Sequence, residues 1–516
     1  MINPASDFPT YFGAEVFAAR GFQPVTRIAD LALPTLAALA APHLDVVMCD
    51  EMIEPVPYDG APDYVGITGK VSQRGRMLAI SREFRRRGIT VVIGGPYASL
   101  DPEALRPHCD ILVRGEIEAI ADQLFADLAA GTWHDEYVGS AVDLAISPIP
   151  AWEGYRNDRA LIGCVQTSRG CPFECEFCDV IQYLGRKQRH KPPAAVVAEL
   201  TLLHRLGYRR VFLADDNLTV HRRRAKELLD ALRHWNARNG ADRMTFITQV
   251  SIDAVRDDEL LSMCFEAGLT HVYVGLETPN KESLREAHKR QNLHGDLVEE
   301  VQRFHAHGIS VTAGLIVGFD ADDSSIFEQQ YEFVMATGIP IFSLGALVAP
   351  VATPLHARMA AEGRLEGDSP EMAALPWTTN IIPARMSRDE LLSGLRKLCN
   401  DIYAPDAFGD RVLKQIDLLS ERPADDTRAH RRTHEPRPTS DTLKLLRSLS
   451  QLGEAEAEMW TRIRRRLSAR PDLTSHVLPV VLQYLQIRYM YDHAGLWDAR
   501  AHDPSQSRPE PLRSFG

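Results

Sequence analysis

The feature that most constrains this chain is a short loop with three cysteines. Cys171, Cys175 and Cys178 follow C-x3-C-x2-C spacing, and Gly170 and Pro172 mark the segment as a turn. A loop can wrap three thiolates around one inorganic centre, whereas a helix or strand would splay them apart. Three thiolates bind three irons of a four-iron, four-sulfur cube, which normally takes four cysteines. The fourth iron would lack a protein ligand, and an open metal position is typical of a reactive site.

A structural zinc site is the alternative for these cysteines. Cys164 lies seven residues before Cys171 and could complete a set of four thiolates. Such sites favour two C-x2-C pairs, and only Cys175 and Cys178 form one. Cys164 also falls in the apolar run 161–165, which predicts a buried strand where a free cysteine packs as a small hydrophobe. The pattern therefore favours an iron–sulfur cluster over zinc.

The cysteine segment resembles the motif of the radical S-adenosylmethionine (SAM) enzymes. In that superfamily the open iron chelates the amino and carboxylate groups of SAM, and one electron from the cluster cleaves SAM to a 5′-deoxyadenosyl radical. The resemblance implies that Cys171, Cys175 and Cys178 hold a 4Fe-4S cluster. It also implies that Phe177, the aromatic residue before the last ligand, lies near the adenine; a place in the hydrophobic core is compatible with that role.

Composition limits the class of protein. The chain has 516 residues, enough for two to four domains, and its 45% hydrophobic and 25% charged content is typical of a soluble globular protein. A net charge of −12 gives no electrostatic reason to expect nucleic-acid binding. Eight cysteines do not make a disulfide framework, and a thiolate-held cluster requires a reducing compartment. With no signal-peptide pattern and no apolar run long enough to span a bilayer, we expect a cytoplasmic protein without a transmembrane segment.

Residues 1 to 150 alternate short apolar strands with helices, which indicates a parallel sheet. Strands are predicted over residues 44–48, 64–68, 90–93 and 111–113. A helix with a basic end is predicted over residues 76–87. Ligands of such sheets bind beyond the carboxyl ends of the strands, where small residues allow a close approach to the backbone. The candidate ligand edge consists of Thr68, Gly94, Gly95, Gly115 and Glu116.

Two segments of this region resemble the cobalamin-binding domain of B12-dependent radical SAM enzymes. They are Gly-Gly-Pro-Tyr-Ala-Ser at 94–99 and Asp-Ile-Leu-Val-Arg-Gly-Glu at 110–116. The chain departs from the family pattern in its very short first strand, and in Leu-Pro-Thr at 33–35 where Pro-Leu-Gly is usual. The resemblance implies that cobalamin is bound by the ligand edge together with Gln73, which lies in the loop after the second strand.

No histidine lies beneath the cobalt in this interpretation. Cobalamin proteins that supply a lower imidazole use Asp-x-His-x-x-Gly, and none of the 18 histidines has Asp two residues before it. The corrin would sit with its own base displaced and with residues 70–74 below it.

After a proline-rich linker at 147–152, repeating strand–helix units predict a partial (β/α) barrel. Its strands are predicted over residues 161–167, 210–214, 245–250, 271–276, 310–317 and 341–347. Chemistry in parallel barrels lies at the carboxyl ends of the strands. Those ends carry Asp215, Asp216, Gln249, Ser251, Gly275, Glu277 and Gly318.

Gly275-x-Glu277 and Gly314-x3-Gly318 resemble the SAM-contacting strands of the superfamily. The resemblance implies that SAM lies against these strands and near Gln249 and Ser251, with Glu277 as its polar contact; a helix N-terminal acid is the alternative for Glu277. Asp215 and Asp216 could form an acid/base pair. Neighbouring residues of an extended segment point to opposite sides, so we expect one to face the cavity and the other to be structural.

From about residue 361 the pattern is helical. Ser387 and Glu390 form a capping box, 421–439 is a polar linker, and apolar residues recur at helical spacing beyond it. Those apolar residues are Leu443, Leu446, Leu449, Met459, Ile463 and Leu467. They predict a small helical domain without a chemical motif, which packs as helices or else caps the cavity or carries a partner surface.

The predicted fold is α/β, with a Rossmann-like cobalamin domain at 1–150, a partial (β/α)6 radical SAM barrel at 151–360 and a helical region at 361–516. The basic segment 179–191, together with the cysteine loop, resembles the subfamily of the hopanoid C-methylases and related natural-product enzymes, over roughly residues 1–420. The resemblance implies transfer of a methyl group from SAM via methylcobalamin to an unactivated carbon or phosphorus of a small-molecule or lipid-like metabolite. It also implies an external electron donor such as flavodoxin or ferredoxin.

There is a physical reason why such a reaction needs two cofactors. The methyl group of SAM is an electrophile, and an sp3 carbon that bears hydrogen offers no nucleophile to attack it. The scheme requires no side-chain acid or base, so no catalytic residue is predicted. A cobalamin-dependent cyclase or oxidative enzyme without methyl transfer would share every motif, and a cobalamin- or cluster-binding regulator is the alternative that is not an enzyme.

Overall fold

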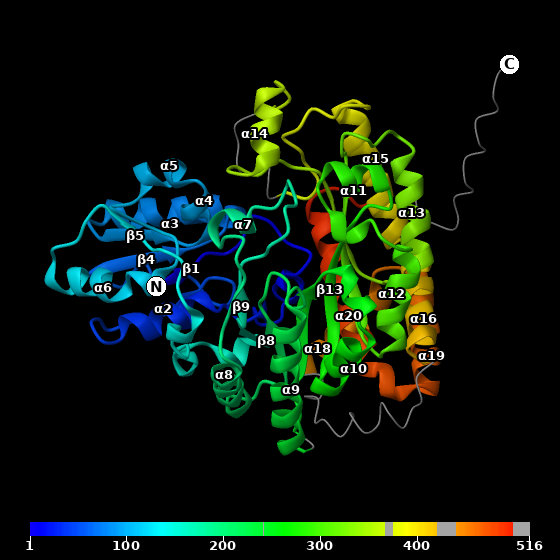
Figure 1. Ribbon diagram of the computed structural model, residues 1–516, viewed down its shortest axis with the longest axis horizontal. Coiled ribbons are helices and arrows are strands. Elements are labelled where there is room, and N and C mark those ends of the chain that lie inside the picture. Colours follow the sequence, from blue (N-terminus) through cyan, green and yellow to red (C-terminus); the bar gives the residue numbers. More distant parts are fainter. Residues whose placement is uncertain (241, 367–374, 421–439, 499–516) are drawn as a thin grey trace.

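The computed structural model describes residues 1–240, 242–366, 375–420 and 440–498. Two parallel sheets lie side by side, and helices cover them (Figure 1). The strand order of the first sheet is β3-β1-β4-β5-β6-β7, and the order of the second is β15-β14-β13-β12-β11-β8-β2. The first sheet and its helices form the blue and cyan part of Figure 1, and the second sheet lies at the centre, with the C-terminal helices beside it.

The first sheet is parallel throughout. Its strands are β1 (Ile2–Asn3), β3 (Cys49–Asp50), β4 (Tyr64–Thr68), β5 (Thr90–Gly94), β6 (Ile111–Arg114) and β7 (Glu136–Val138). Strands β4, β5 and β6 confirm three predictions, but the strand predicted at 44–48 is wrong. Because β1 has only two residues, which pair with Cys49 and Asp50, the ladder cannot extend to the preceding apolar residues, and Val47 is left exposed.

Helices pack apolar residues onto both faces of the first sheet. The helices are α2 (Ala32–Ala40), α3 (Arg74–Arg86), α4 (Pro96–Leu100), α5 (Pro102–Leu105) and α6 (Ala121–Ala130). Met77 and Phe84 of α3 share a core with Ile67 and Ile93, and Leu124 of α6 shares another with Ile111. Covering both faces leaves the carboxyl edge of the strands as the place for a ligand.

The second sheet contains the six predicted strands, which confirms the partial barrel. They are β8 (Ala160–Val165), β11 (Arg210–Leu213), β12 (Thr245–Val250), β13 (Leu269–Glu277), β14 (Ser310–Val317) and β15 (Phe342–Ala346). A seventh strand, β2 (Thr26–Ile28), pairs in parallel with β8. It was not predicted, and it brings part of the first 150 residues into the barrel sheet.

Helices cover the outside of the barrel. They are α8 (Pro193–Arg205), α9 (Arg222–Arg238), α10 (Asp258–Ala267), α12 (Leu297–Ala306) and α13 (Ile326–Thr337). The short helix α11 (Lys281–Glu286) follows β13 at its carboxyl end. The covering helices bury residues such as Leu200, Leu229 and Val301 against the apolar outer face of the strands. This packing leaves the carboxyl ends of the strands, with the loops that follow them, as the chemical end of the barrel.

The C-terminal helices, except for the first of them, share the core of the barrel. They are α14 (Pro354–Ala361), α15 (Arg388–Tyr403), α16 (Pro405–Ser420), α18 (Ser440–Arg447), α19 (Glu454–Ala469) and α20 (Thr474–His493). The predicted Ser387–Glu390 capping box opens α15. Five of the six predicted apolar positions are buried, whereas Leu443 is exposed. The predicted linker 421–439 lies outside the described residues.

The last helix ties the end of the described chain to its beginning. The hydroxyls of Tyr11 and Tyr491 lie 2.7 Å apart, and Gln486 donates to the Thr10 carbonyl at 3.0 Å. Apart from α14, these helices therefore pack as a layer on the barrel. In the described parts of the chain, no helix is both long enough and apolar enough to span a bilayer.

Candidate functional site

The three cysteines lie on one loop at the carboxyl end of β8. The loop runs from β9 (Ser168–Arg169) to α7 (Val180–Tyr183), and β10 (Arg189–His190) pairs antiparallel with β9. Gly170 has φ +90°, and a Cβ there would lie 2.8 Å from the Lys187 carbonyl oxygen. Only glycine fits this turn without strain, which explains the residue that precedes Cys171.

Two of the loop thiols, those of Cys171 and Cys178, have raised pKa values. Burial raises the pKa of Cys171 above its ordinary value and that of Cys178 to about 12, so a metal has to displace the protons when it binds. Cys164 lies buried in β8, as predicted. Among the residues that the structure places, no three acidic, histidine or cysteine side chains gather closely enough for a single metal ion. The three loop cysteines are included in that statement, so the preference for a cluster over zinc stays a prediction.

Lys289 is a residue of the site that the sequence did not indicate. Its Nζ lies 2.5 Å from Oε1 of Glu277 and 5.8 Å from the centre of the Phe177 ring. Burial works to lower the pKa of Lys289, but the charge and hydrogen bond of Glu277 together with the charges of Cys175 and Cys178 outweigh burial and leave the pKa above its ordinary value. Its positive charge also acts on the thiols of the loop and would offset the negative charge of bound thiolates.

Glu277 and Gly275 form the end of β13 around this lysine. Glu277 is buried and has φ +65°, at a register shift between β13 and β14. A Cβ at Gly275 would collide with the Glu277 carboxylate and would lie 2.8 Å from Nζ of Lys289. The structure therefore brings Gly275, Glu277 and Phe177, three predicted residues, together around one ammonium group.

Three side chains that bind this strand end or the cysteine loop carry buried acceptors without a partner. Oε1 of Gln291, Oδ1 of Asn292 and Oε1 of Gln330 each have no hydrogen-bond partner in the described structure. The amides of these side chains are anchored, since Asn292 donates to the Gly275 carbonyl at 2.9 Å and Gln330 to the Glu277 carbonyl at 3.2 Å. A ligand with N–H or O–H donors would satisfy such acceptors.

Gln249, Ser251 and Gly318 lie at neighbouring strand ends without contacting Lys289. Gln249 is half-buried on β12. Ser251 is buried and donates to Oδ1 of Asp253 at 2.5 Å, within its own turn. The Gly318 amide donates to Oδ2 of Asp322 at 3.0 Å. Their predicted role in binding SAM stays a prediction.

Asp215 and Asp216, after β11, both hold the cysteine loop. Asp215 accepts the amides of Thr167 and Ser168 at 2.7 Å each, and Asp216 accepts the amide of Gly170 at 3.0 Å. Asp215 is buried and Asp216 is half-buried, and the hypothesis that one of the two faces the cavity stays a prediction. Burial raises the pKa of Asp215 to about 6.

The predicted ligand edge of the first sheet is built from close backbone contacts. Gly95 has φ +97°, and a Cβ there would lie 2.7 Å from Oγ1 of Thr68 and 2.8 Å from the Gly69 amide. Gly94 lies against Val113, and Gly115 lies directly against the Gly139 carbonyl. These glycines allow the loops at the strand ends to pack closely on one another.

Gln73 and Glu116, also predicted to bind cobalamin, have partners within the chain. Gln73 donates to Oδ1 of Asn3 at 2.9 Å and accepts the Lys70 amide at 2.8 Å. The Glu116 carboxylate binds two guanidinium groups, those of Arg169 and Arg189. Direct contact of either residue with a cofactor stays a prediction, while their observed role is to join segments far apart in the sequence.

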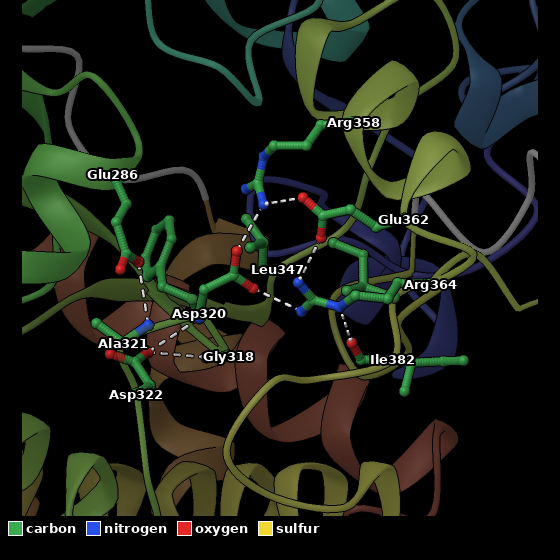
Figure 2. A network of polar contacts seen from close by, with 12 residues as sticks. Glu286, Gly318, Asp320, Ala321, Asp322, Leu347, Arg358, Glu362, Arg364 and Ile382 are labelled. Atoms are coloured by element: carbon green, nitrogen blue, oxygen red, sulfur yellow. Dashed lines mark hydrogen bonds and ion pairs between the residues drawn. The ribbon is translucent and has the colours of Figure 1, made fainter.

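A second ion network reaches the loop from α14. Arg358 binds both carboxylate oxygens of Glu176, at 2.6 and 3.0 Å, and Glu176 lies between Cys175 and Phe177. As Figure 2 shows, Arg358 also binds Asp320 at 2.6 Å, and Arg364 binds the other oxygen of Asp320 at 2.5 Å. Glu362 contacts both arginines. We call these five side chains the Arg358 network.

Comparison with known proteins identifies relatives along most of the chain. The description "Radical SAM superfamily" matches residues 165–334, and "Domain of unknown function (DUF4070)" matches residues 353–493. The chain is 32% identical to an uncharacterized methyltransferase of Synechocystis sp. over 74% of its own length and 72% of the relative. It is 30% identical to the hopanoid C-2 methylase of Rhodopseudomonas palustris, over 74% of its own length and 73% of that enzyme.

Two solved structures share the fold. The methyltransferase TsrM of Kitasatospora setae, determined with cobalamin and a 4Fe-4S cluster, matches 91% of this chain and 99% of its own, with a TM-score of 0.58 and 18% identity. The cobalamin-dependent SAM radical enzyme OxsB matches 97% of this chain and 82% of its own, with a TM-score of 0.60 and 15% identity. Both matches include the first sheet as well as the barrel.

Proposed function

Because this chain belongs to the cobalamin-dependent radical SAM enzymes and is a methyltransferase of the hopanoid C-methylase-like subfamily, we propose that it methylates an unactivated carbon or phosphorus of a small-molecule or lipid-like metabolite. Enzymes of this family use a 4Fe-4S cluster, SAM and cobalamin. When bound, the cluster and SAM supply a radical that removes hydrogen from the substrate, and cobalamin supplies the methyl group.

One observation carries the proposal: the cysteine loop is joined directly to the ligand edge of the first sheet. Arg169, two residues before Cys171, binds Glu116, the residue after Gly115. This connection supports a single site that includes the thiols and the glycine-lined edge, as a reaction that uses both cofactors requires.

Cys171, Cys175 and Cys178 are the proposed cluster ligands, and the donor set fits. The three thiols belong to one loop, and an ammonium group lies near enough to offset thiolate charge. The cluster also needs an electron, so an external donor such as flavodoxin or ferredoxin, and the reducing cytoplasm, belong to the proposal.

Glu277 and Lys289 are the proposed partners of the amino-acid end of SAM. A carboxylate and an ammonium side by side complement the ammonium and carboxylate of that zwitterion. The unpartnered acceptors of Gln291, Asn292 and Gln330 fit further donors of the ligand. Phe177 offers an aromatic face in the same group.

Thr68, Gly94, Gly95 and Gly115 are the proposed cradle of cobalamin. Support for this role is their place at the carboxyl ends of parallel strands, where ligands of such sheets bind. Their strands end at the edge that faces the cysteine loop.

The experiment uses the anaerobically reconstituted protein with hydroxocobalamin, SAM and a strong reductant, without substrate. The proposal expects S-adenosylhomocysteine together with methylcobalamin, and 5′-deoxyadenosine from slow cleavage of SAM. A cyclase or oxidative enzyme would give 5′-deoxyadenosine alone, and a regulator would give neither product. The triple Cys→Ala variant of the loop should hold no iron, whereas Cys164→Ala should keep the wild-type iron content; zinc at stoichiometry would overturn the cluster assignment.

A further inference from the structure

Four charged side chains form a buried connection between the first sheet and the cysteine loop. Glu116 and Glu118 follow β6, and Arg169 and Arg189 lie opposite each other on β9 and β10. The side chains are 5%, 2%, 13% and 14% exposed, respectively. We call this set the Glu–Arg joint.

The hydrogen bonds of the joint are saturated and its charges balance. Arg169 binds Glu118 at 2.6 Å and 3.1 Å and Glu116 at 3.0 Å, so one planar guanidinium spans both carboxylates. Arg189 binds both oxygens of Glu116, one of them at 2.7 Å. The Val142 amide and the Ser147 hydroxyl fill further acceptor positions of Glu116 and Glu118. A closed network of charge-assisted bonds holds its members in one geometry.

The joint lies between the two proposed cofactor sites. On one side Glu116 follows Gly115 of the cobalamin cradle directly, and on the other Arg169 is two residues from Cys171. Arg189 also donates to the Leu184 carbonyl at 3.0 Å, and the neighbouring Gly185 carbonyl accepts the Cys171 amide at 3.3 Å. A shift in the joint therefore moves the cysteine loop relative to the ligand edge.

We propose that the Glu–Arg joint sets the separation between cobalt and the cluster, and that Arg169 and Glu118 are positioning residues for methyl transfer. This rests on the proposed function. The two cofactors act on the same SAM and substrate molecules, and small errors in the position of reacting groups cost large factors in rate. The scheme gives the joint a role that is distinct from binding either cofactor.

The test compares Arg169→Lys and Glu118→Gln with wild type. A lysine cannot span two carboxylates as a guanidinium does, and Glu118→Gln keeps the shape but removes a charge. Arg488→Lys is the matched control, because Arg488 and Glu456 are also a buried pair, both 8% exposed, between α20 and α19 and away from the site. Each protein is reconstituted with iron and hydroxocobalamin, and both contents are measured.

Two measurements follow. Magnetic coupling between cobalt(II) and the reduced cluster, read from the electron paramagnetic resonance of the loaded protein, depends steeply on their separation and should change in both joint variants. With SAM and reductant, formation of S-adenosylhomocysteine should fall at least about tenfold, while formation of 5′-deoxyadenosine stays near wild type. The control should match wild type in both measurements.

The outcomes separate this inference from the proposed function. Wild-type protein that makes no S-adenosylhomocysteine would contradict the proposed function itself. If wild type makes it and the joint variants keep the same coupling and product ratio, the joint does not position the cofactors. Loss of iron or cobalamin from both joint variants, with the control intact, would show that the joint only maintains the fold, and it would overturn the inference as well.

Discussion

The cysteine loop is held by ion pairs on two sides, and the two sides differ in burial and in charge. On the N-terminal side, the Glu–Arg joint has two acids, two arginines and side chains that are at most 14% exposed. On the C-terminal side, the Arg358 network has three acids against two arginines, and its side chains are 11% to 41% exposed. Buried pairs are costly to break, whereas half-exposed pairs contribute little.

The Glu–Arg joint and the Arg358 network also bind different parts of the cysteine loop. The joint holds the strand that leads into the first cysteine, and Arg358 holds Glu176, between the second cysteine and Phe177. The Leu355 amide of α14 adds a hydrogen bond to the Glu176 carbonyl at 3.1 Å. The difference teaches that the entry to the loop is fixed by the fold, while its far side depends on contacts that solvent can weaken.

The largest effect should come from removing the centre of the joint. Arg169→Ala leaves Glu116 and Glu118 buried with one fewer positive charge, and breaking a buried pair from one side costs about 3–5 kcal/mol of stability. Urea unfolding of the apoprotein measures the change in the free energy of unfolding. A loss of less than about 1 kcal/mol would place the joint in the same class as a surface ion pair and remove the contrast between the two sides.

Asp215 sharpens the comparison because it holds the same loop without an arginine. Burial raises the pKa of its carboxyl to about 6, from the ordinary 3.8. The folded state therefore takes up a proton before the unfolded state does, and the contribution of this carboxyl to stability is greatest below about pH 4 and declines until the pH exceeds about 6. Wild type and Asp215→Asn should diverge by about 2–3 kcal/mol over that range, as measured by urea unfolding at each pH.

The contribution of the Glu–Arg joint to stability should change with pH in the opposite direction to that of Asp215. Burial works to raise the pKa of Glu116 and Glu118, but hydrogen bonds from Arg189 and Arg169 outweigh burial and leave both pKa values below the ordinary 4.5. Their contribution is therefore present above about pH 4.5 and is lost as the pH falls through the lowered folded-state pKa.

For the Asp215 prediction, a difference in unfolding free energy between wild type and Asp215→Asn that stays flat between about pH 4 and 7 would show that Asp215 does not titrate there.

The sequence predicts the barrel better than the first sheet, for a physical reason. The six predicted barrel strands have four to nine residues each, which is long enough for a strand pattern to be read from the sequence, so all six could be placed. Strand β2 has three residues, Thr26-Arg27-Ile28, and its partner β8 lies more than 130 residues away. The segment 44–48 reads as a strand by itself, but the two-residue β1 offers it nothing to pair with.

The residues of the candidate site also divide into those that the sequence predicts and those that it does not. The cysteines and glycines could be found because their chemistry or their backbone requires those residue types at fixed spacing. Lys289 could not, because His288-Lys289-Arg290 reads as a solvated basic stretch, and its burial is decided by Glu277 on another element. The sequence predicts Glu116 as a ligand contact, because it does not reveal that Arg189, 73 residues later, binds this carboxylate.

A smaller effect is expected on the C-terminal side. Arg358→Ala removes the bidentate contact with Glu176, but the network is half-exposed and water can solvate the freed carboxylates, so we expect a loss of about 1 kcal/mol in the free energy of unfolding. Iron content after reconstitution should stay at the wild-type value, because the joint still holds the loop. Loss of the cluster would show that Arg358 is as necessary as Arg169 and that exposure is a poor guide here.

The smallest effect, and the sharpest test of the comparison, is the response of the two sides to salt. Raising the salt concentration from about 0.1 M to about 1 M shortens the screening length from about 10 Å to about 3 Å. The cost of Arg358→Ala should then shrink by roughly 0.5 kcal/mol, because wild type loses part of an attraction that the variant already lacks. The cost of Arg169→Ala should not change, since solvent ions cannot enter between side chains this deeply buried. Equal salt dependence in the two variants would mean that the joint is open to solvent in solution, and the cofactor separation could then not depend on it.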